Sequence, residues 1–153
     1  YRIFNTHLEV QGNDQIPGAI QTAQAAQLLD VALKDTPQNR RLILLGDMNS
    51  SPNDPAYGPL TPTPYMLFVA SGLQDIWDLR PGATAGWSCC QAEDLSNRVS
   101  MLNQRIDLVL SREMPRKVKD VRLLGEVAAD RTKPPGRGLW PSDHASVAAR
   151  IQY

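Results

Sequence analysis

Aromatic residues and histidines are scarce in this chain of 153 residues, and neither sign of charge is in excess. Aromatic side chains make up 6% of the sequence, there are two histidines, and 16 basic residues balance 16 acidic ones. A protein that holds nucleic acid mainly through its phosphates needs a strong positive field, and a base-stacking platform needs aromatic side chains between basic ones. A non-catalytic nucleic-acid-binding module is therefore the weakest interpretation.

Long apolar runs and linker-like segments are also missing. No apolar run is long enough to span a membrane, and the first residues lack the pattern of a signal peptide, but nothing indicates a cellular location. With 42% hydrophobic residues and no low-complexity stretch, the chain can bury a core of its own. We expect a single domain over residues 1–153.

The only two cysteines, Cys89 and Cys90, are adjacent. Disulfide geometry usually needs Cα atoms about 4.4 to 6.8 Å apart, so we expect two free thiols in a strand, with one side chain buried. No histidine or further cysteine stands nearby at metal-ligand spacing, which argues against a zinc site.

What the chain does contain is a set of polar clusters, each attached to an apolar, strand-like run. The clusters are Asn5-Thr6-His7-Leu8, Gly46-Asp47-Met48-Asn49, Arg105-Ile106-Asp107 and Ser142-Asp143-His144. Aspartate is depleted in strands because its short side chain competes with the backbone for hydrogen bonds, so Asp107 within a strand needs a reason beyond folding. Together the clusters supply the parts of a metal-assisted phosphoester hydrolase.

The pattern of apolar residues predicts alternating α and β segments. Pro17 suits the first turn of a helix that extends to Lys34, because Ala25, Leu28 and Leu29 continue an apolar stripe. A short helix is expected over 65–70 and a loop over 131–140. Strands are expected over 2–10, 41–45, 73–77, 86–90, 104–111, 118–124 and 145–152.

Strand geometry places several polar side chains together. Asn5 and His7 are two residues apart and project to one face, and an extended 47–49 segment would present Asp47 and Asn49 to one side with Met48 pointing into the protein. Gly-Asp-x-Asn is also a common turn sequence, and that alternative stays open. Ligands gather beyond the carboxyl ends of strands in open α/β sheets, where this cluster lies.

In this order, the His-containing strand, Gly-Asp-x-Asn, Arg-Ile-Asp and Ser-Asp-His resemble the carboxyl-terminal half of the endonuclease/exonuclease/phosphatase superfamily. The resemblance runs from Tyr1 to Tyr153. It implies half of a four-layer α/β sandwich with a mixed sheet. The family has an earlier half that carries an Asn and a metal-binding Glu. Nothing here precedes Tyr1, so we expect a partial domain that lacks its amino-terminal half and is weak or inactive alone.

The residues and the resemblance together assign roles in the site. Imidazole suits proton abstraction near neutral pH, which makes His144 the candidate base, and the resemblance makes Asp107 its orienting partner. The resemblance also implies that Asn5, His7 and Asn49 bind the substrate phosphate. The candidate ligands for Mg²⁺ or Mn²⁺ are Asp143, Asp47 and Asn49, because hard oxygen donors suit these ions.

The sequence leaves the substrate and the partners open. The expected activity is metal-dependent hydrolysis of a phosphodiester or phosphomonoester, with nucleic acid, phospholipid and sugar phosphate all possible. The alternative is a non-catalytic assembly module that retains the motifs. Loops 51–63 and 131–140 are candidates for selectivity, and Trp87 and Trp140 for stacking or, by preference, core packing. A half-domain would leave one sheet face uncovered, to be met by the missing half or by a second copy in a homodimer.

Overall fold

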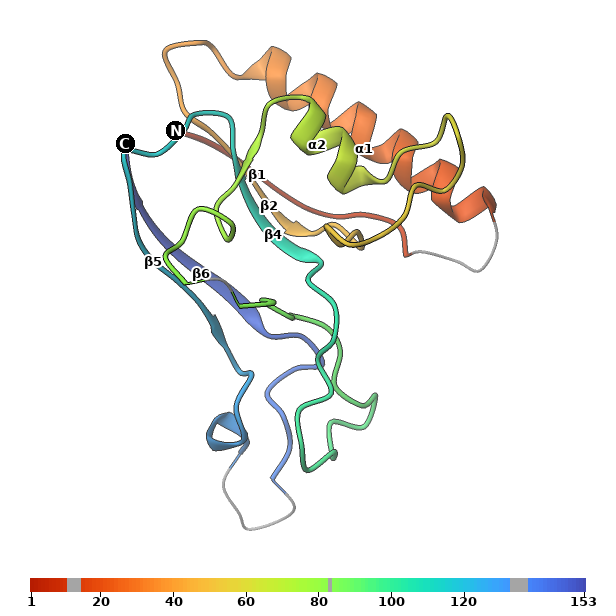
Figure 1. Ribbon diagram of the computed structural model, residues 1–153, viewed down its shortest axis with the longest axis vertical. Coiled ribbons are helices and arrows are strands. Elements are labelled where there is room, and N and C mark those ends of the chain that lie inside the picture. The colour runs from red at the N-terminus through yellow and green to blue at the C-terminus, as the bar shows by residue number, and fades with distance from the viewer. Residues whose placement is uncertain (11–14, 83, 133–137) are drawn as a thin grey trace.

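The computed structural model describes residues 1–10, 15–82, 84–132 and 138–153, and its elements form three layers (Figure 1). One sheet has four strands in the order β1-β2-β4-β3, and the second contains β5 and β6. Because β1 and β2 are parallel while β4 is antiparallel to both of its neighbours, the larger sheet is mixed, as expected. The elements are β1 (Arg2–His7), α1 (Gln15–Asp35), β2 (Leu42–Asp47), α2 (Pro64–Ala70), β3 (Gln74–Asp75), β4 (Asp107–Ser111), β5 (Lys117–Leu124), the 3₁₀ helix η1 (Ala128–Asp130) and β6 (Ser146–Gln152).

The two α-helices cover one face of the four-stranded sheet (Figure 1). The apolar stripe of α1 meets alternate residues of β2 and β4, which point to the helical side because strand side chains alternate between faces. Phe68 of α2 is fully buried in the same core. The core comprises Leu8, Ala25, Leu29, Ala32, Leu42, Leu44, Met48, Phe68, Leu73, Leu108 and Leu110.

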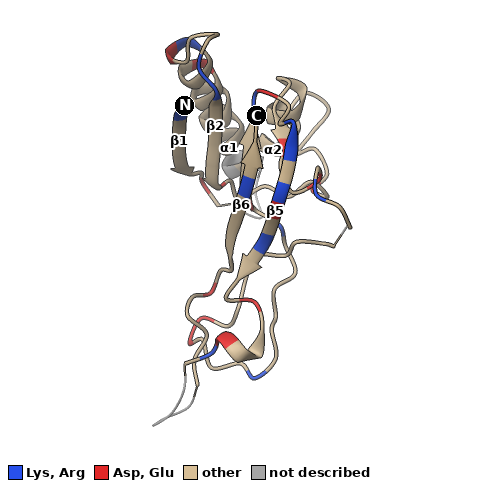
Figure 2. Ribbon diagram, turned by 90° about the vertical axis from the view of Figure 1, so that its left-hand side faces the viewer, with Lys and Arg blue, Asp and Glu red and all other residues tan. Residues whose placement is uncertain are grey.

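The β5–β6 sheet packs on the other face, against β4. Val109 of β4 joins a second apolar core with Val147 and Ile151 of β6. The solvent side of this two-stranded sheet is basic, and Figure 2 shows Lys and Arg along both strands. The exposed basic residues are Lys117, Lys119, Arg122 and Arg150. This outer surface is therefore hydrophilic and needs no further layer over it.

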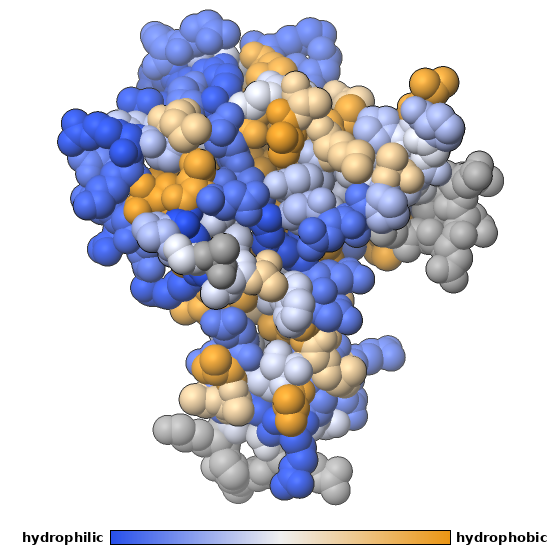
Figure 3. Space-filling model, viewed as in Figure 1, coloured by the Kyte–Doolittle hydropathy of each residue, from blue (hydrophilic) through white to orange (hydrophobic). Residues whose placement is uncertain are grey.

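An apolar part of the inner sheet face stays open beside β1. Leu45 pairs with Asn5 on one side and with Val109 on the other, so the odd-numbered residues of β1 share the face of the sheet on which β6 packs against β4. Ile3 on this face is 63% exposed. In the view of Figure 3, apolar residues elsewhere gather in separate patches between hydrophilic ones. The uncovered face that the sequence predicted is thus limited to the β1 side.

Most expected elements are present, with shifted ends. The first strand ends at His7, and the second continues through Gly46 to Asp47. The prediction of a strand at 86–90 is wrong. Within this segment only Cys89 makes isolated bridges, one to Gln104 and one to His144, so the segment lies between two others and does not join a sheet. Residues 133–137 of the expected loop lie outside the described residues. No described helix is both long and apolar enough to cross a membrane.

Replacing Gly46 by alanine is expected to destabilise the fold strongly. Gly46 has φ +132°, and a Cβ there would overlap the carbonyl oxygen of Thr6 on β1. The substitution forces β1 and β2 apart at the end that carries the polar clusters, and such strained backbone positions cost about 1–3 kcal/mol. Urea unfolding measures the loss, with Gly72→Ala as the matched control: it shares a positive φ but has open space at its Cβ. Equal losses in both variants would contradict the role of close strand approach.

Candidate active site

The register of the larger sheet brings three of the predicted site residues into one row. His7 is the partner of Asp47, and Asp47 is the partner of Asp107. Directly paired residues on neighbouring strands have their side chains on the same face, and in an antiparallel pair such as Asp47 and Asp107 the Cβ atoms are roughly 4.5–5.5 Å apart. The end of β1, the end of β2 and the start of β4 therefore present an imidazole and two carboxylates side by side.

The segment after β2 is a turn and not the extended segment that we expected. Asn49 has φ 45°, and its backbone N–H donates to Asp47 Oδ1 at 2.8 Å. This hydrogen bond closes an Asx turn, in which an aspartate side chain accepts from the backbone N–H two residues further along the chain. Met48 is fully buried, as predicted. The turn thus fixes one oxygen of the Asp47 carboxylate and leaves the other facing the site.

Gln21 supports this turn from helix α1, and sequence reasoning did not single it out. Its side chain is fully buried, and its Nε2 donates to the carbonyl oxygens of Asn49 and Glu9, each at 2.7 Å. The available signal was a polar residue one helical turn before Ala25 on an otherwise apolar stripe. A buried amide in such a position needs hydrogen-bond partners. Here the partners are carbonyl oxygens of the segments that follow β1 and β2.

Asn49 and His7 contact each other beside Asp47. Asn49 Nδ2 donates to Leu8 O at 2.9 Å and lies 3.0 Å from His7 Nε2, which is itself 3.5 Å from Asp47 Oδ2. Both N–H groups of the Asn49 amide thus have acceptors within the protein, Leu8 O and His7 Nε2. Donation to a phosphoryl oxygen would require one of these hydrogen bonds to break. The His7 side chain is 66% exposed, and Asn5 is exposed on the same face.

His144 completes the site from the second sheet, just before β6. Its Nδ1 lies 2.8 Å from Asp107 Oδ2, which confirms the contact predicted from the sequence. A carboxylate oxygen accepts hydrogen bonds, so in the neutral form of His144 this contact favours the tautomer with the proton on Nδ1 and the lone pair on Nε2. Nε2 lies 3.9 Å from Asp47 Oδ2. One nitrogen of the imidazole is therefore held by Asp107, and the other faces the Asp47 carboxylate.

Residues Ser88–Gln91, here called the strap, hold Asp107 and His144 at this distance. The Oγ of Ser88 accepts from the backbone N–H of Asp107 at 3.1 Å, and its carbonyl oxygen accepts from Ala145 N at 2.8 Å. Gln91 N donates to Asp143 O at 2.8 Å. Ser88 is fully buried and was not predicted, because nothing in its local sequence distinguishes it from any serine of a strand. The strap ties the two sheets together at the site.

A buried ion pair anchors the chain just before Asp107. The Arg105 guanidinium bonds to the carboxylate of Asp75, and its other nitrogen donates to Asp78 Oδ1 at 2.9 Å. Arg105 and Asp75 are both buried, so the pair is protected from solvent screening. Arg105 thus fixes the position of the chain that leads into β4.

Two groups of the site have shifted proton affinities. Burial raises the pKa of Asp47, and the charge of Asp107 adds to this effect, although the hydrogen bond from Asn49 and the two histidines oppose it. Burial lowers the pKa of His144, but the hydrogen bond and charge of Asp107, with the charges of Asp47 and Asp143, outweigh it and raise the pKa above 6.5. The carboxylate cluster therefore favours a proton or another cation.

The oxygen donors of the cluster fit a hard divalent cation. Ligand atoms of Asp47, Asp107 and His144 all lie within 4.8 Å of one another. In the described part of the chain, the ion-pair partners of Asp47 are the two histidines, with no lysine or arginine. Asp143 is exposed next to His144 and does not belong to this group of three. A partly buried carboxylate cluster without a permanent cation is suited to Mg²⁺ or Mn²⁺.

The cysteines differ from expectation. Cys89 and Cys90 form a disulfide, so the prediction of free thiols is wrong. That prediction rested on the usual Cα–Cα distance of disulfides, which is a statistical preference and not a strict limit. Here both cysteines belong to the strap, which is hydrogen-bonded on both sides. Cys89 is buried and Cys90 is exposed. The argument that no histidine is near also fails, because the fold brings His144 from 54 positions away to 3.9 Å from Cys90 Sγ.

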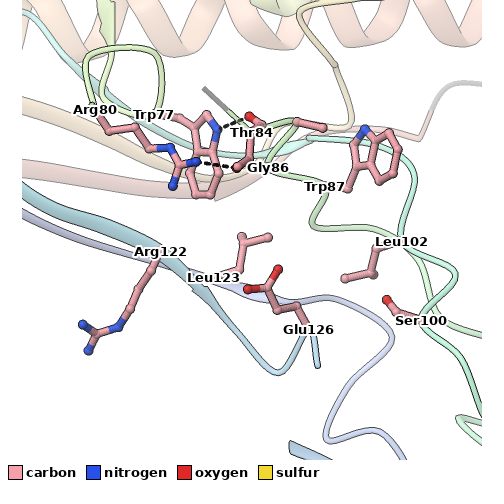
Figure 4. Close-up of a pocket in the computed structure, with 11 residues that line it drawn as sticks. Trp77, Arg80, Thr84, Gly86, Trp87, Ser100, Leu102, Arg122, Leu123 and Glu126 are labelled. Atoms are coloured by element: carbon pink, nitrogen blue, oxygen red, sulfur yellow. Dashed lines mark hydrogen bonds between the residues drawn. The ribbon is translucent and has the colours of Figure 1, made fainter. Parts of the chain in front are cut away.

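A cavity of about 510 Å³ lies beside the strap (Figure 4). Trp87, which directly precedes the strap, is 48% exposed on its wall, so the preference for core packing is wrong for this residue and right for Trp140, which is 1% exposed. On the opposite wall, the Arg80 guanidinium lies 4.3 Å from the Trp77 ring centre. Glu126 and Ser100 add polar groups to the cavity.

Comparison with known proteins agrees with this arrangement. Residues 12–144 match the model of the Endonuclease/Exonuclease/phosphatase family. The chain belongs to this family. No curated protein matches the sequence.

The chain spans about half the length of the following solved structures, which share its fold. The mannosyl-6-phosphatase Bt3783 of Bacteroides thetaiotaomicron has a TM-score of 0.67 and 21% identity, over 99% of this chain and 51% of that one. Truncated TDP2 of Caenorhabditis elegans has a TM-score of 0.66 and 19% identity, over 99% and 54%. D. rerio TDP2, complexed with a single-strand DNA product, has a TM-score of 0.64 and 19% identity, over 99% and 56%. At such identities the similarity concerns the fold.

Proposed function

We propose that the chain carries the general-base side of a metal-dependent phosphoester hydrolase site. The observation that carries this proposal is the 2.8 Å contact between Asp107 and His144, with Nε2 of the same ring 3.9 Å from Asp47 Oδ2. A histidine oriented by a carboxylate and open at its second nitrogen is the arrangement that general-base catalysis requires. Family membership supports phosphoester hydrolysis as the reaction class.

In the proposed mechanism, His144 Nε2 takes a proton from the water that attacks phosphorus. Asp107 holds the protonated Nδ1 and stabilises the imidazolium that forms. Asn5, His7 and Asn49 face the phosphate, where donors near the developing charge are most effective. Asp47, Asn49 and Asp143 would hold Mg²⁺ or Mn²⁺, which when bound supplies positive charge to the phosphoryl oxygens.

Substrate choice depends on the surfaces around this centre. The exposed indole of Trp87 and the cavity behind it lie directly beside the strap, and an aromatic face there can stack on a planar group of the substrate. We infer that this wall, with the loop over 51–63, selects among nucleic acid, phospholipid and sugar phosphate. A turnover panel of single- and double-stranded DNA, sphingomyelin-type lipid and phosphomonoesters, with added Mg²⁺ or Mn²⁺, tests the proposed activity and its class.

Replacing Asp107 by asparagine is expected to lower turnover and to move its pH dependence. The base works as neutral imidazole, and Asp107 raises the pKa of His144, so activity of the wild type falls as pH drops through a value above 6.5. In Asp107→Asn this acidic limb shifts to lower pH, while the plateau falls by about 10²- to 10⁴-fold. The pH profile of kcat at saturating Mg²⁺ measures both effects, with the exposed Asp35→Asn as control. A lower plateau with an unmoved limb would contradict this role.

We also propose that the open inner face beside β1 is covered by a second copy when the chain is alone. Ile3 supplies exposed apolar surface there, and closed two-fold dimers are the commonest soluble homo-oligomers. Sedimentation equilibrium is expected to show a dimer that Ile3→Asp dissociates and Leu33→Asp, on the far side of α1, does not. A stable wild-type monomer at micromolar concentration would contradict the proposal. A dimer without turnover on any substrate class would support the alternative of a non-catalytic assembly module.

A further inference from the structure

The fold places the sulfur atoms of both cysteines against the candidate base. Cys90 Sγ lies 3.9 Å from Nε2 of His144, the nitrogen that is not bound to Asp107. Ligand atoms of Cys89, Cys90 and His144 all lie within 4.8 Å of one another. Cys90 is exposed, so ions in solution can reach this cluster. The cluster is distinct from the oxygen-rich group around Asp47, although the two share one imidazole nitrogen.

Backbone hydrogen bonds hold this cluster in place. Cys89 bridges both Gln104 and His144, so the strap lies between the segment that leads into β4 and the one that leads into β6. The bonds that Ser88 and Gln91 make to Ala145 and Asp143 fix the strap on either side of the two cysteines. The sulfur atoms and the imidazole therefore approach each other without any ordering of a loop.

The donor set is that of a soft divalent cation. Thiolate sulfur and imidazole nitrogen are the typical ligands of Zn²⁺, and bond lengths of about 2.3 and 2.0–2.1 Å place two such ligands roughly 3.5 Å apart around a tetrahedral ion. The observed 3.9 Å between Cys90 Sγ and His144 Nε2 needs only a small adjustment. Asp107 on Nδ1 completes the carboxylate–histidine arrangement that commonly orients a zinc-bound imidazole.

The state of the disulfide controls this donor set. Disulfide sulfurs carry no thiolate charge, so the cysteines become ligands after reduction. A dithiol reductant supplies two electrons and two protons, the S–S bond breaks to give two thiols, and the reductant closes into its own disulfide. Binding of the ion then releases the two thiol protons to solvent.

We propose that the dithiol form of Cys89 and Cys90, with Nε2 of His144, is a binding site for a soft divalent cation such as Zn²⁺. An ion bound there occupies the lone pair that His144 uses as a base, so the reduced protein is inhibited by Zn²⁺ and the disulfide form is not. The inhibition rests on the proposed function, whereas the binding site does not.

Spectroscopy with Co²⁺ and competition with a chromogenic Zn²⁺ chelator test the binding site itself. In protein reduced with a phosphine, Co²⁺ is expected to give sulfur-to-cobalt charge-transfer absorption, and the disulfide form is expected to give none. Cys90→Ser should weaken Zn²⁺ binding by at least roughly 100-fold, and Asp107→Asn by about 10- to 100-fold, the usual loss for an outer partner of a ligand. Asp94→Asn, an exposed carboxylate outside the cluster, should bind as the wild type does.

Absence of the charge-transfer band in reduced wild type, or equal Zn²⁺ affinity in reduced Cys90→Ser, would overturn the proposal. Circular dichroism of each variant shows that a loss of binding is not a loss of fold. Turnover with saturating Mg²⁺, measured with and without Zn²⁺ in both redox forms, tests the inhibition. If the protein binds Co²⁺ through sulfur but hydrolyses no substrate, the proposed metal site is supported and the proposed function is contradicted. The failure of one proposal can therefore be distinguished from the failure of the other.

Discussion

Replacing His144 by glutamine is expected to lower turnover by about 10²- to 10⁴-fold, the usual effect of removing a general base. Glutamine can still donate a hydrogen bond to Asp107, so the strap and the start of β6 keep their positions, but its amide cannot take a proton from water. The loss should therefore appear in kcat with little change in the unfolding temperature.

The measurement is the initial rate at the pH of maximal wild-type activity, with Mg²⁺ in excess. Lys34→Gln, on the helical side of the molecule, serves as the control and should keep full activity. Near-normal, metal-dependent turnover in His144→Gln would remove this residue from the mechanism.

Replacing Asp47 by asparagine is expected to abolish most turnover and, without metal, to stabilise the fold at neutral pH. The pKa of Asp47 is raised, above all by burial, so the folded state binds a proton there more tightly than the unfolded state does. Its ionisation therefore destabilises the fold as pH rises from the ordinary value of 3.8 through the raised pKa. Asparagine removes that penalty and can still accept the hydrogen bond from Asn49 N.

Thermal unfolding at several pH values in a chelator separates these effects. The variant should melt a few degrees above the wild type near pH 7, and the gain should vanish below about pH 4, where the Asp47 carboxyl is protonated in both states. Added Mg²⁺ should stabilise the wild type more than the variant, because a ligand of the folded state raises stability by about 2.7 kcal/mol at 100 times its Kd. A variant less stable than the wild type at neutral pH, or one that Mg²⁺ stabilises equally, would contradict this account of Asp47.

Sequence patterns predicted the parts of the site that depend on local periodicity and motif order. The apolar alternation of the strands and the stripe of α1 gave the main elements. The resemblance to the family, which rests on the order of the motifs, implied that Asp107 and His144 would meet, although 37 positions separate them. The helix and the strands are encoded within short windows, where side-chain direction follows from the type of element.

The supports of the site could not be read in this way, because they depend on contacts between distant segments. Ser88 Oγ accepts from two backbone N–H groups in a distant segment. In the same way, Gln21 binds carbonyl oxygens and Arg105 binds two carboxylates that lie far away in the sequence. The expected strand at 86–90 was wrong for the same reason: its residues favour a strand, but they bridge two segments instead of joining a sheet. The turn at Asn49 was one of two local alternatives, and Gln21 from α1 supports the one observed.

The most direct test of the central claim is metal-dependent turnover of the phosphoester panel. Turnover is measured on this chain and on the longest polypeptide that its gene encodes, and each is compared with its own His144→Gln variant. The account predicts Mg²⁺- or Mn²⁺-dependent hydrolysis of at least one substrate class by the longest product, reduced at least about 100-fold by the substitution. Absence of hydrolysis in every class, or hydrolysis that His144→Gln leaves unchanged, would contradict it.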